Sequence, residues 1–81
     1  MAKYRILLRK VTDVHGRDVF EREFDNDEEA IKAARTKLLD VLHYGYEYFV
    51  KCMRLHDDGT NLCDTIYYAD YDKAMAEHLR D

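Results

Sequence analysis

The two cysteines are the strongest nucleophiles in this chain of 81 residues, which contains no serine. A catalytic cysteine needs a neighbour that lowers its pKa, and only His56 lies near Cys52 or Cys63 in the sequence. Both thiols lie among apolar residues, so we expect reduced, buried side chains that pack as small hydrophobic groups. The sequence leaves a disulfide between Cys52 and Cys63 open, because they fall on neighbouring predicted strands.

The four histidines are scattered along the chain and show no metal-ligand spacing such as HxxxH. They are His15, His43, His56 and His78. The segment 56–59, His-Asp-Asp-Gly, lacks the alternating oxygen ligands of a calcium loop and is typical of a hairpin turn. No pair of carboxylates stands out as an acid and base couple, and a P-loop is absent. We therefore expect no catalytic residues, no metal and no cofactor, and a protein that is not an enzyme.

Aromatic side chains are the unusual feature of the composition, with seven tyrosines and three phenylalanines. In the predicted third and fourth strands they fall on both faces, although a sheet with one solvated face should be polar there. Either the second helix covers the additional apolar face, or that face is a protein interface, where such residues are favoured. For the interface we predict four binding residues, namely Tyr46, Phe49, Met53 and Tyr68.

The first two predicted strands alternate in polarity and form a hairpin. Residues 3–12 place Tyr4, Ile6 and Leu8 on one side, and residues 18–24 follow a loop at 14–16. Pairing Ile6 with Phe24 and Arg9 with Glu21 keeps apolar residues together on one side and opposite charges together on the other. A register shifted by one residue would place like charges opposite each other.

The strongest helix signal follows this hairpin. Asn26 and Glu29 form a capping box, and an apolar stripe then recurs at helical spacing. Gly45 after His43 predicts where the helix ends. The stripe consists of Ile31, Ala34, Leu38 and Val41 or Leu42.

Two further strands and a helix complete the predicted fold. Residues 46–55 and 62–69 are predicted strands joined by the turn 57–60. Asp70 caps a final helix whose inner face carries Tyr71, Ala74, Met75 and His78 or Leu79. The element order β-β-α-β-β-α predicts one α+β domain over 1–81, a two-layer sandwich with an antiparallel four-stranded sheet and helices on one face. With no apolar leader or membrane-spanning stretch, we expect a cytoplasmic protein.

Charge is distributed unevenly over a net charge of −4. Residues 1–24 carry six basic and four acidic side chains, whereas residues 25–81 carry seven and thirteen. The acidic part is either a solvated surface or a surface for a basic partner. A basic stripe of Lys3, Arg5, Arg9 and Lys10 could contact phosphates, but Glu21 and Glu23 would neutralise it, so nucleic acid is not the expected partner.

The stretch 24–34, Phe-Asp-Asn-Asp-Glu-Glu-Ala-Ile-Lys-Ala-Ala, resembles a pattern found in small phage and prophage proteins. In that pattern a strand ends in an aromatic residue, and a polar cap then begins a helix that packs on the sheet. Over residues 3–69 the β-β-α-β-β order is similar to that of some small anti-CRISPR inhibitors, which are not enzymes and bind nucleoprotein complexes. The resemblance carries over no functional residue, and the acidic balance departs from relatives that use a basic face.

Together these features predict a non-enzymatic protein-binding module that blocks a protein or nucleoprotein complex sterically, as a phage or mobile-element inhibitor would. The alternatives are a homo-oligomeric structural protein, such as a homodimer, that buries the same aromatic face against its own copy, and a nucleic-acid binder that uses the basic first hairpin.

Overall fold

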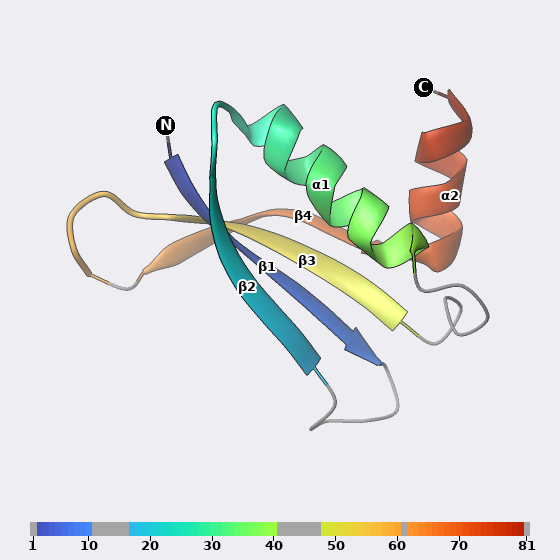
Figure 1. Ribbon diagram of the computed structural model, residues 1–81, viewed down its shortest axis with the longest axis horizontal. Coiled ribbons are helices and arrows are strands. Elements are labelled where there is room, and N and C mark those ends of the chain that lie inside the picture. The colour runs from blue at the N-terminus through green and yellow to red at the C-terminus, as the bar shows by residue number, and fades with distance from the viewer. Residues whose placement is uncertain (1, 11–16, 41–47, 61, 81) are drawn as a thin grey trace.

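The computed structural model describes residues 2–10, 17–40, 48–60 and 62–80. Six elements follow one another in the predicted order of two strands, a helix, two strands and a helix (Figure 1). They are β1 (Ala2–Lys10), β2 (Arg17–Phe24), α1 (Asp27–Leu39), β3 (Tyr48–Leu55), β4 (Cys63–Asp70) and α2 (Tyr71–Arg80).

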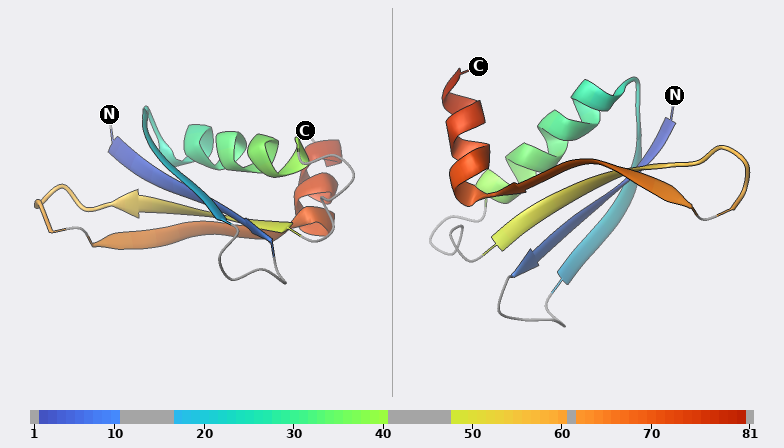
Figure 2. Two further views of the ribbon diagram at one scale, coloured as in Figure 1. Left: turned by 60° about the horizontal axis from the view of Figure 1, so that its bottom comes forward. Right: turned by 180° about the vertical axis from the view of Figure 1, so that it is seen from behind.

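The four strands form one antiparallel sheet in the order β2-β1-β3-β4, so β1 and β3 are central and β2 and β4 are the edges. Both helices lie on the same side of this sheet, as the left view of Figure 2 shows. The predicted α+β two-layer sandwich is thus confirmed. The second helix does not cover the opposite face of the sheet. The explanation that this helix buries the additional apolar side chains is therefore wrong.

The register between β1 and β2 differs from the prediction. Ile6 lies opposite Phe20 and not Phe24, and Arg9 lies opposite Arg17. The shift is four residues, an even number, so every side chain keeps its predicted face. Alternation of polarity cannot distinguish registers that differ in this way.

Particular contacts of the observed register explain this choice. The rings of Tyr4 and Phe24 meet edge to face with centroids 5.7 Å apart. On the other side of the sheet, Arg5 Nη2 lies 2.8 Å from Glu21 Oε1, so Glu21 pairs with Arg5 and not with the predicted Arg9. The predicted loop at 14–16 falls outside the described residues.

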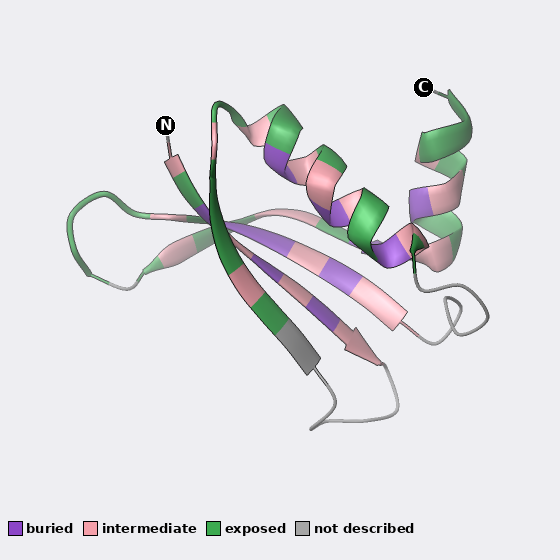
Figure 3. Cartoon of the chain, viewed as in Figure 1, coloured by how far each residue is buried: buried purple, intermediate pink, exposed green. Residues whose placement is uncertain are grey.

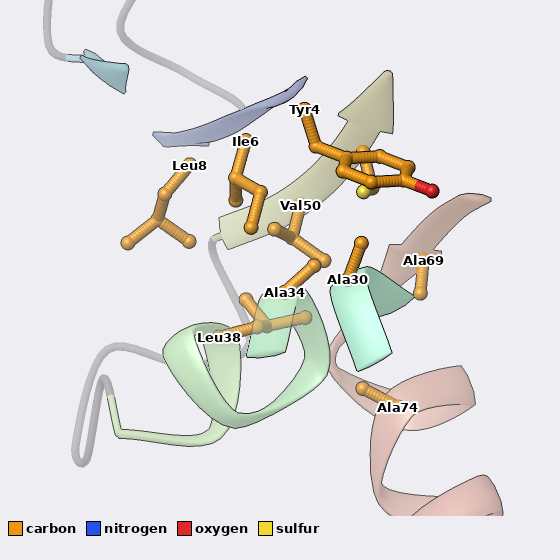
Figure 4. Close-up of a cluster of buried hydrophobic side chains, with 10 residues drawn as sticks. Tyr4, Ile6, Leu8, Ala30, Ala34, Leu38, Val50, Ala69 and Ala74 are labelled. Carbon is orange, nitrogen blue, oxygen red and sulfur yellow. The ribbon is translucent and has the colours of Figure 1, made fainter. Parts of the chain in front are cut away.

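The core lies between the sheet and α1, where ten side chains are buried (Figure 3). On α1 the buried residues are Ala30, Ala34 and Leu38, so Ala30 and not the predicted Ile31 faces the sheet. Alanines on this stripe let the helix approach the strands closely. The sheet contributes Tyr4, Ile6, Leu8, Val50, Cys52 and Ala69, and α2 contributes Ala74 (Figure 4).

The N-terminal cap of α1 is the one predicted from the sequence. The side chain of Asn26 accepts a hydrogen bond of 2.9 Å from the backbone N–H of Glu29, as predicted. At the other end α1 stops at Leu39 with Asp40 as its C-cap. The predicted end at His43 and Gly45, and the predicted core residues Val41 and Leu42, lie outside the described residues.

The second helix is also capped as predicted, since Asp70 Oδ1 accepts a 2.9 Å hydrogen bond from the backbone N–H of Lys73. Its predicted inner face is only partly correct. Ala74 is fully buried, but His78 is exposed and Leu79 is 77% exposed. The last turn of α2 extends away from the sheet (Figure 1), and its residues 78–80 are exposed.

The predicted turn between β3 and β4 is confirmed. Gly59 has a positive φ of 80°, which a residue with a side chain adopts only with strain. Asp58 Oδ1 accepts hydrogen bonds from the Thr60 hydroxyl and backbone N–H, at 2.6 and 3.0 Å. These bonds hold the pKa of the Asp58 carboxyl below its usual value.

Candidate functional site

The candidate site is the face of the sheet turned away from both helices, which we call the open face (Figure 2). Apolar and charged side chains are interspersed on it. Its apolar members include Leu7, Val19, Phe49, Met53 and Tyr68, and its charged members include Arg5, Arg9, Glu21 and Lys51.

Strand pairing places two of the predicted binding residues side by side on this face. Phe49 and Tyr68 have ring centroids 5.1 Å apart with the ring planes at 33°. Tyr68 remains 52% exposed, although tyrosine is a large apolar side chain. A partly exposed aromatic pair of this kind is a suitable anchor for a protein partner.

Two cations flank the aromatic pair. Arg9 lies opposite Phe49 on the neighbouring strand, and its guanidinium carbon is 5.9 Å from the Phe49 ring centroid. Lys51 lies opposite Tyr68. Within the described part of the chain neither cation forms an ion pair, and the buried Nε of Arg9 has no hydrogen-bond partner.

A shallow apolar pocket lies beside the aromatic pair, toward β2. It is lined by Leu7, Val19 and Met53, with the ion pair of Arg5 and Glu21 at its edge. Val19 is 45% exposed, whereas Met53 is only 8% exposed. Met53 therefore supports the surface from below, and Val19 is the side chain that a partner can reach.

Of the four predicted binding residues, the structure brings Phe49, Met53 and Tyr68 to one face, and Tyr46 lies outside the described residues. The prediction missed Leu7 and Val19. Leu7 is the odd member of the run Ile6-Leu7-Leu8, and it interrupts the otherwise basic outer side of β1. An apolar residue at this position was the sequence signal that could have indicated an apolar patch on the outer side of β1. Val19 lies directly opposite Leu7.

A β-bulge in β4 changes which residues share this face. Tyr67 pairs with Cys52, but Thr65 pairs with Met53, so Ile66 is the additional residue. Regular alternation along residues 62–69 would place Ile66 on the same face as Tyr68, but Ile66 packs against the buried core. Alternation would likewise place Cys63 on the face of Tyr67, but Cys63 pairs with Leu55 and lies on the opposite face.

The predicted basic stripe is divided between the two faces. Lys3, Arg5 and Arg9 occupy alternate positions of β1 on the open face, whereas Lys10 follows the alternation of the buried residues. Arg5 is paired with Glu21 at 2.8 Å, and Lys3 lies opposite Glu23. The stripe is thus largely neutralised, which leaves Arg9 and Lys51 as the cations available to a partner.

On the helix side, a tyrosine, a carboxylate and an arginine tie α1 to the sheet. The Tyr4 hydroxyl donates a 2.6 Å hydrogen bond to Asp27 Oδ1, and Arg54 Nη1 lies 3.4 Å from the same carboxylate. Burial and the bond to Asp27 raise the pKa of Tyr4 to about 12. Tyr4 is therefore a neutral hydrogen-bond donor at ordinary pH, which is a structural role.

A second cluster of the same composition ties α2 to the sheet and to α1. The Tyr67 hydroxyl donates to Glu77 Oε2 at 3.0 Å, and Arg35 Nη1 donates to the same oxygen at 3.3 Å. Burial and the bond to Glu77 raise the pKa of Tyr67 well above its usual value. Both clusters hold helices in place and leave no group poised for proton transfer.

Both cysteines are free. Their positions in the β3–β4 ladder are three residues apart, roughly 10 Å along the strand, which is too far for a disulfide. Cys52 is fully buried, and burial raises the pKa of its thiol to about 11. A thiol held protonated in this way is a poor nucleophile.

One further polar contact joins a histidine and a carboxylate. His56 Nε2 lies 3.0 Å from Asp64 Oδ2 at the exposed end of the β3–β4 hairpin. Among the described residues, no three His, Cys, Asp or Glu side chains are grouped so that they could hold a metal ion. Within the same residues, neither helix has the length and apolar character needed to cross a membrane.

Comparisons with protein-family models, with curated proteins and with solved structures found no match to this chain.

Proposed function

We propose that this protein is a non-enzymatic binding module that docks a protein partner on the open face of its sheet. The observation that carries the proposal is the Phe49–Tyr68 pair, with Tyr68 52% exposed, on a sheet face that neither helix covers. Aromatic anchors surrounded by charged side chains are the usual composition of a protein-binding surface.

The dimensions of the molecule suit this role. The chain folds into a slab of 39 × 32 × 15 Å, and the open face is one of its two broad sides. A typical specific interface buries about 800 Å² on each partner, which a side of this breadth can supply. Such a slab acts by covering its partner, so the proposed mechanism is steric blocking of a host protein or nucleoprotein complex, as in a phage or mobile-element inhibitor.

The charges of the open face define the chemistry of the partner surface. Arg9 and Lys51 flank the aromatic pair without carboxylate partners among the described residues. A complementary partner presents an apolar side chain to Phe49 and Tyr68, with carboxylates placed beside it. This arrangement favours a protein over a nucleic acid, whose phosphates would meet Glu21 and Glu23 on the same face.

The test is affinity capture from host lysate on immobilised protein, with Tyr68→Asp as the disrupting variant. Ala76→Asp, an exposed position on α2, adds the same charge on the opposite side of the slab and is the matched control. We expect a partner that wild type and Ala76→Asp retain and that Tyr68→Asp and Phe49→Asp release. Retention by all four proteins, or by none, contradicts the proposal.

The captured partner also allows a quantitative test. Truncation of Tyr68 to alanine should weaken binding by at least about 1–2 kcal/mol while the melting temperature stays nearly unchanged. A protein that binds single-stranded oligonucleotide, and loses it on Arg5→Glu and Arg9→Glu, would instead be a nucleic-acid binder.

A further inference from the structure

A second candidate site lies on the helix side of the sheet, in a groove between α1 and the edge strand β2. Because α1 packs mainly on β3, it leaves the inner side of β2 only partly covered. The apolar floor of this groove consists of Phe20, Phe24 and Ala33, all of them half-buried. We call this surface the β2–α1 groove.

Three cations surround the apolar floor. Lys37 Nζ lies 5.5 Å and the guanidinium carbon of Arg22 lies 5.4 Å from the centroid of the Phe20 ring. Lys32 lines the groove from the same helix as Lys37. In the described segments none of the three cations forms an ion pair with a carboxylate.

The two carboxylates of the groove stand at its ends. Glu29 belongs to the first turn of α1 and Asp40 is its C-cap, so they are separated by roughly 16 Å along the helix axis. Lys32 and Lys37 lie between them. The middle of the groove is therefore cationic above an apolar floor, although the chain as a whole carries a net charge of −4.

We propose that the β2–α1 groove binds an acidic peptide segment of a protein partner. An apolar side chain of the segment rests on Phe20 and Phe24, and its carboxylates pair with Lys32 and Lys37. A helix forms one wall and a sheet edge the floor, so the groove fits a single segment rather than a flat surface. This site lies on the opposite side of the sheet from the open face, and it does not depend on the function proposed for that face.

The test is a titration of isotope-labelled protein, followed by amide chemical shifts, with two short peptides. One has a central phenylalanine flanked by glutamates, and the other has the same phenylalanine flanked by lysines. We expect the glutamate peptide to shift the amides of Phe20, Ala33 and Lys37, whether or not it also shifts those of Leu7 and Tyr68 on the open face. The lysine peptide should bind at least about tenfold more weakly, because it meets like charges.

Charge reversal gives the matched variants. Lys32→Glu combined with Lys37→Glu should weaken binding of the glutamate peptide in the groove by at least about tenfold, whereas Lys3→Glu combined with Arg80→Glu, at two exposed positions outside the groove, should leave the affinity read from the groove amides unchanged. Thermal melting shows whether both double variants fold. If either variant does not fold, the comparison of the two peptides on the wild-type protein still tests the proposal.

Equal binding of the two peptides, shifts confined to the open face, or no shifts at all would overturn the proposal. So would a single-stranded oligonucleotide that shifts the same groove amides more strongly than the glutamate peptide, because the groove would then bind phosphates.

Discussion

The two faces of the sheet are built from the same four strands, yet they differ in how their apolar side chains are covered. On the helix side, Tyr4, Ile6 and Val50 are at most 1% exposed beneath α1. On the open face, the neighbouring residues of the same strands include Leu7 and Phe49, which are only half-buried. Alternation supplies apolar side chains to both faces, but the helices cover one.

This difference separates stability from binding. The covered face holds the fold through close packing of alanines and through the two clusters in which a tyrosine donates to a carboxylate. The open face contributes less to stability, since its anchors keep contact with water. A substitution on the covered face should therefore unfold the protein, whereas one on the open face should change what it binds.

The largest effect is expected from Leu38→Ala. Leu38 is fully buried, so truncation should lower the free energy of unfolding by about 2–5 kcal/mol. The matched control is Leu7→Ala on the open face, which should cost about 1 kcal/mol or less. Urea unfolding of both variants measures the difference, and equal losses would contradict the division between the faces.

The reactivity of the two cysteines also tests the difference between the covered face and the exposed parts of the molecule. Cys52 lies in the core with a pKa raised to about 11, whereas Cys63 is partly exposed. Because Cys52 can react only when the core opens, a thiol reagent at neutral pH should label it at least about a hundredfold more slowly than Cys63. Mass spectrometry of the labelled protein gives both rates, and similar rates would mean that α1 does not seal the sheet.

A smaller effect is expected from Tyr4→Phe, which removes the hydrogen bond to Asp27 and should cost about 1 kcal/mol. Tyr68→Phe is the control, because the Tyr68 side chain is 52% exposed and no comparable buried bond is lost. Denaturation of the two variants under the same conditions measures the cost. An unchanged stability for Tyr4→Phe would show that the hydrogen bond from Tyr4 to Asp27 does not hold α1 on the sheet.

The same tyrosine predicts an alkaline transition. The pKa of Tyr4 is raised from 10.0 to about 12, so folding favours its neutral form. This contribution to stability is fully present below pH 10 and is lost as the pH rises toward 12. Unfolding measured across that range should show a shallower decline for Tyr4→Phe than for wild type, and parallel declines would contradict the assignment.

The smallest effect on stability is expected from Tyr68→Ala. With half of its surface in water, this side chain should contribute less than about 0.5 kcal/mol to the free energy of unfolding. Calorimetry can measure this value. A loss as large as that of Leu38→Ala would show that Tyr68 belongs to the core and would withdraw it as an anchor.

Elements whose signal is local could be predicted from the sequence. The caps at Asn26 and Asp70 and the turn at Gly59 each depend on a few adjacent residues, and all three are confirmed. Phe49 and Tyr68 were both predicted as binding residues, and the structure places their rings side by side on the open face. The side on which the helices pack could not be predicted, because both faces of β3 and β4 carry apolar residues.

The features that were missed depend on contacts between distant segments. The β1–β2 register is shifted by four residues, which preserves every face and so leaves the pattern unchanged. The bulge at Ile66 inserts one residue into β4, and nothing in the alternation of that strand indicates it. On α1, Ala30 replaces Ile31 in the core because the rotation of the helix is set by the sheet beneath it.

The most direct test of the proposal that the open face is free for a protein partner is the mass in solution. Light scattering with reductant present, over roughly a hundredfold range of concentration, shows whether the face is already occupied by a second copy. We predict a monomer throughout, for wild type and for Tyr68→Asp alike. A dimer that Tyr68→Asp and Phe49→Asp dissociate would contradict the account, because the aromatic pair would then be the interface of a homo-oligomer.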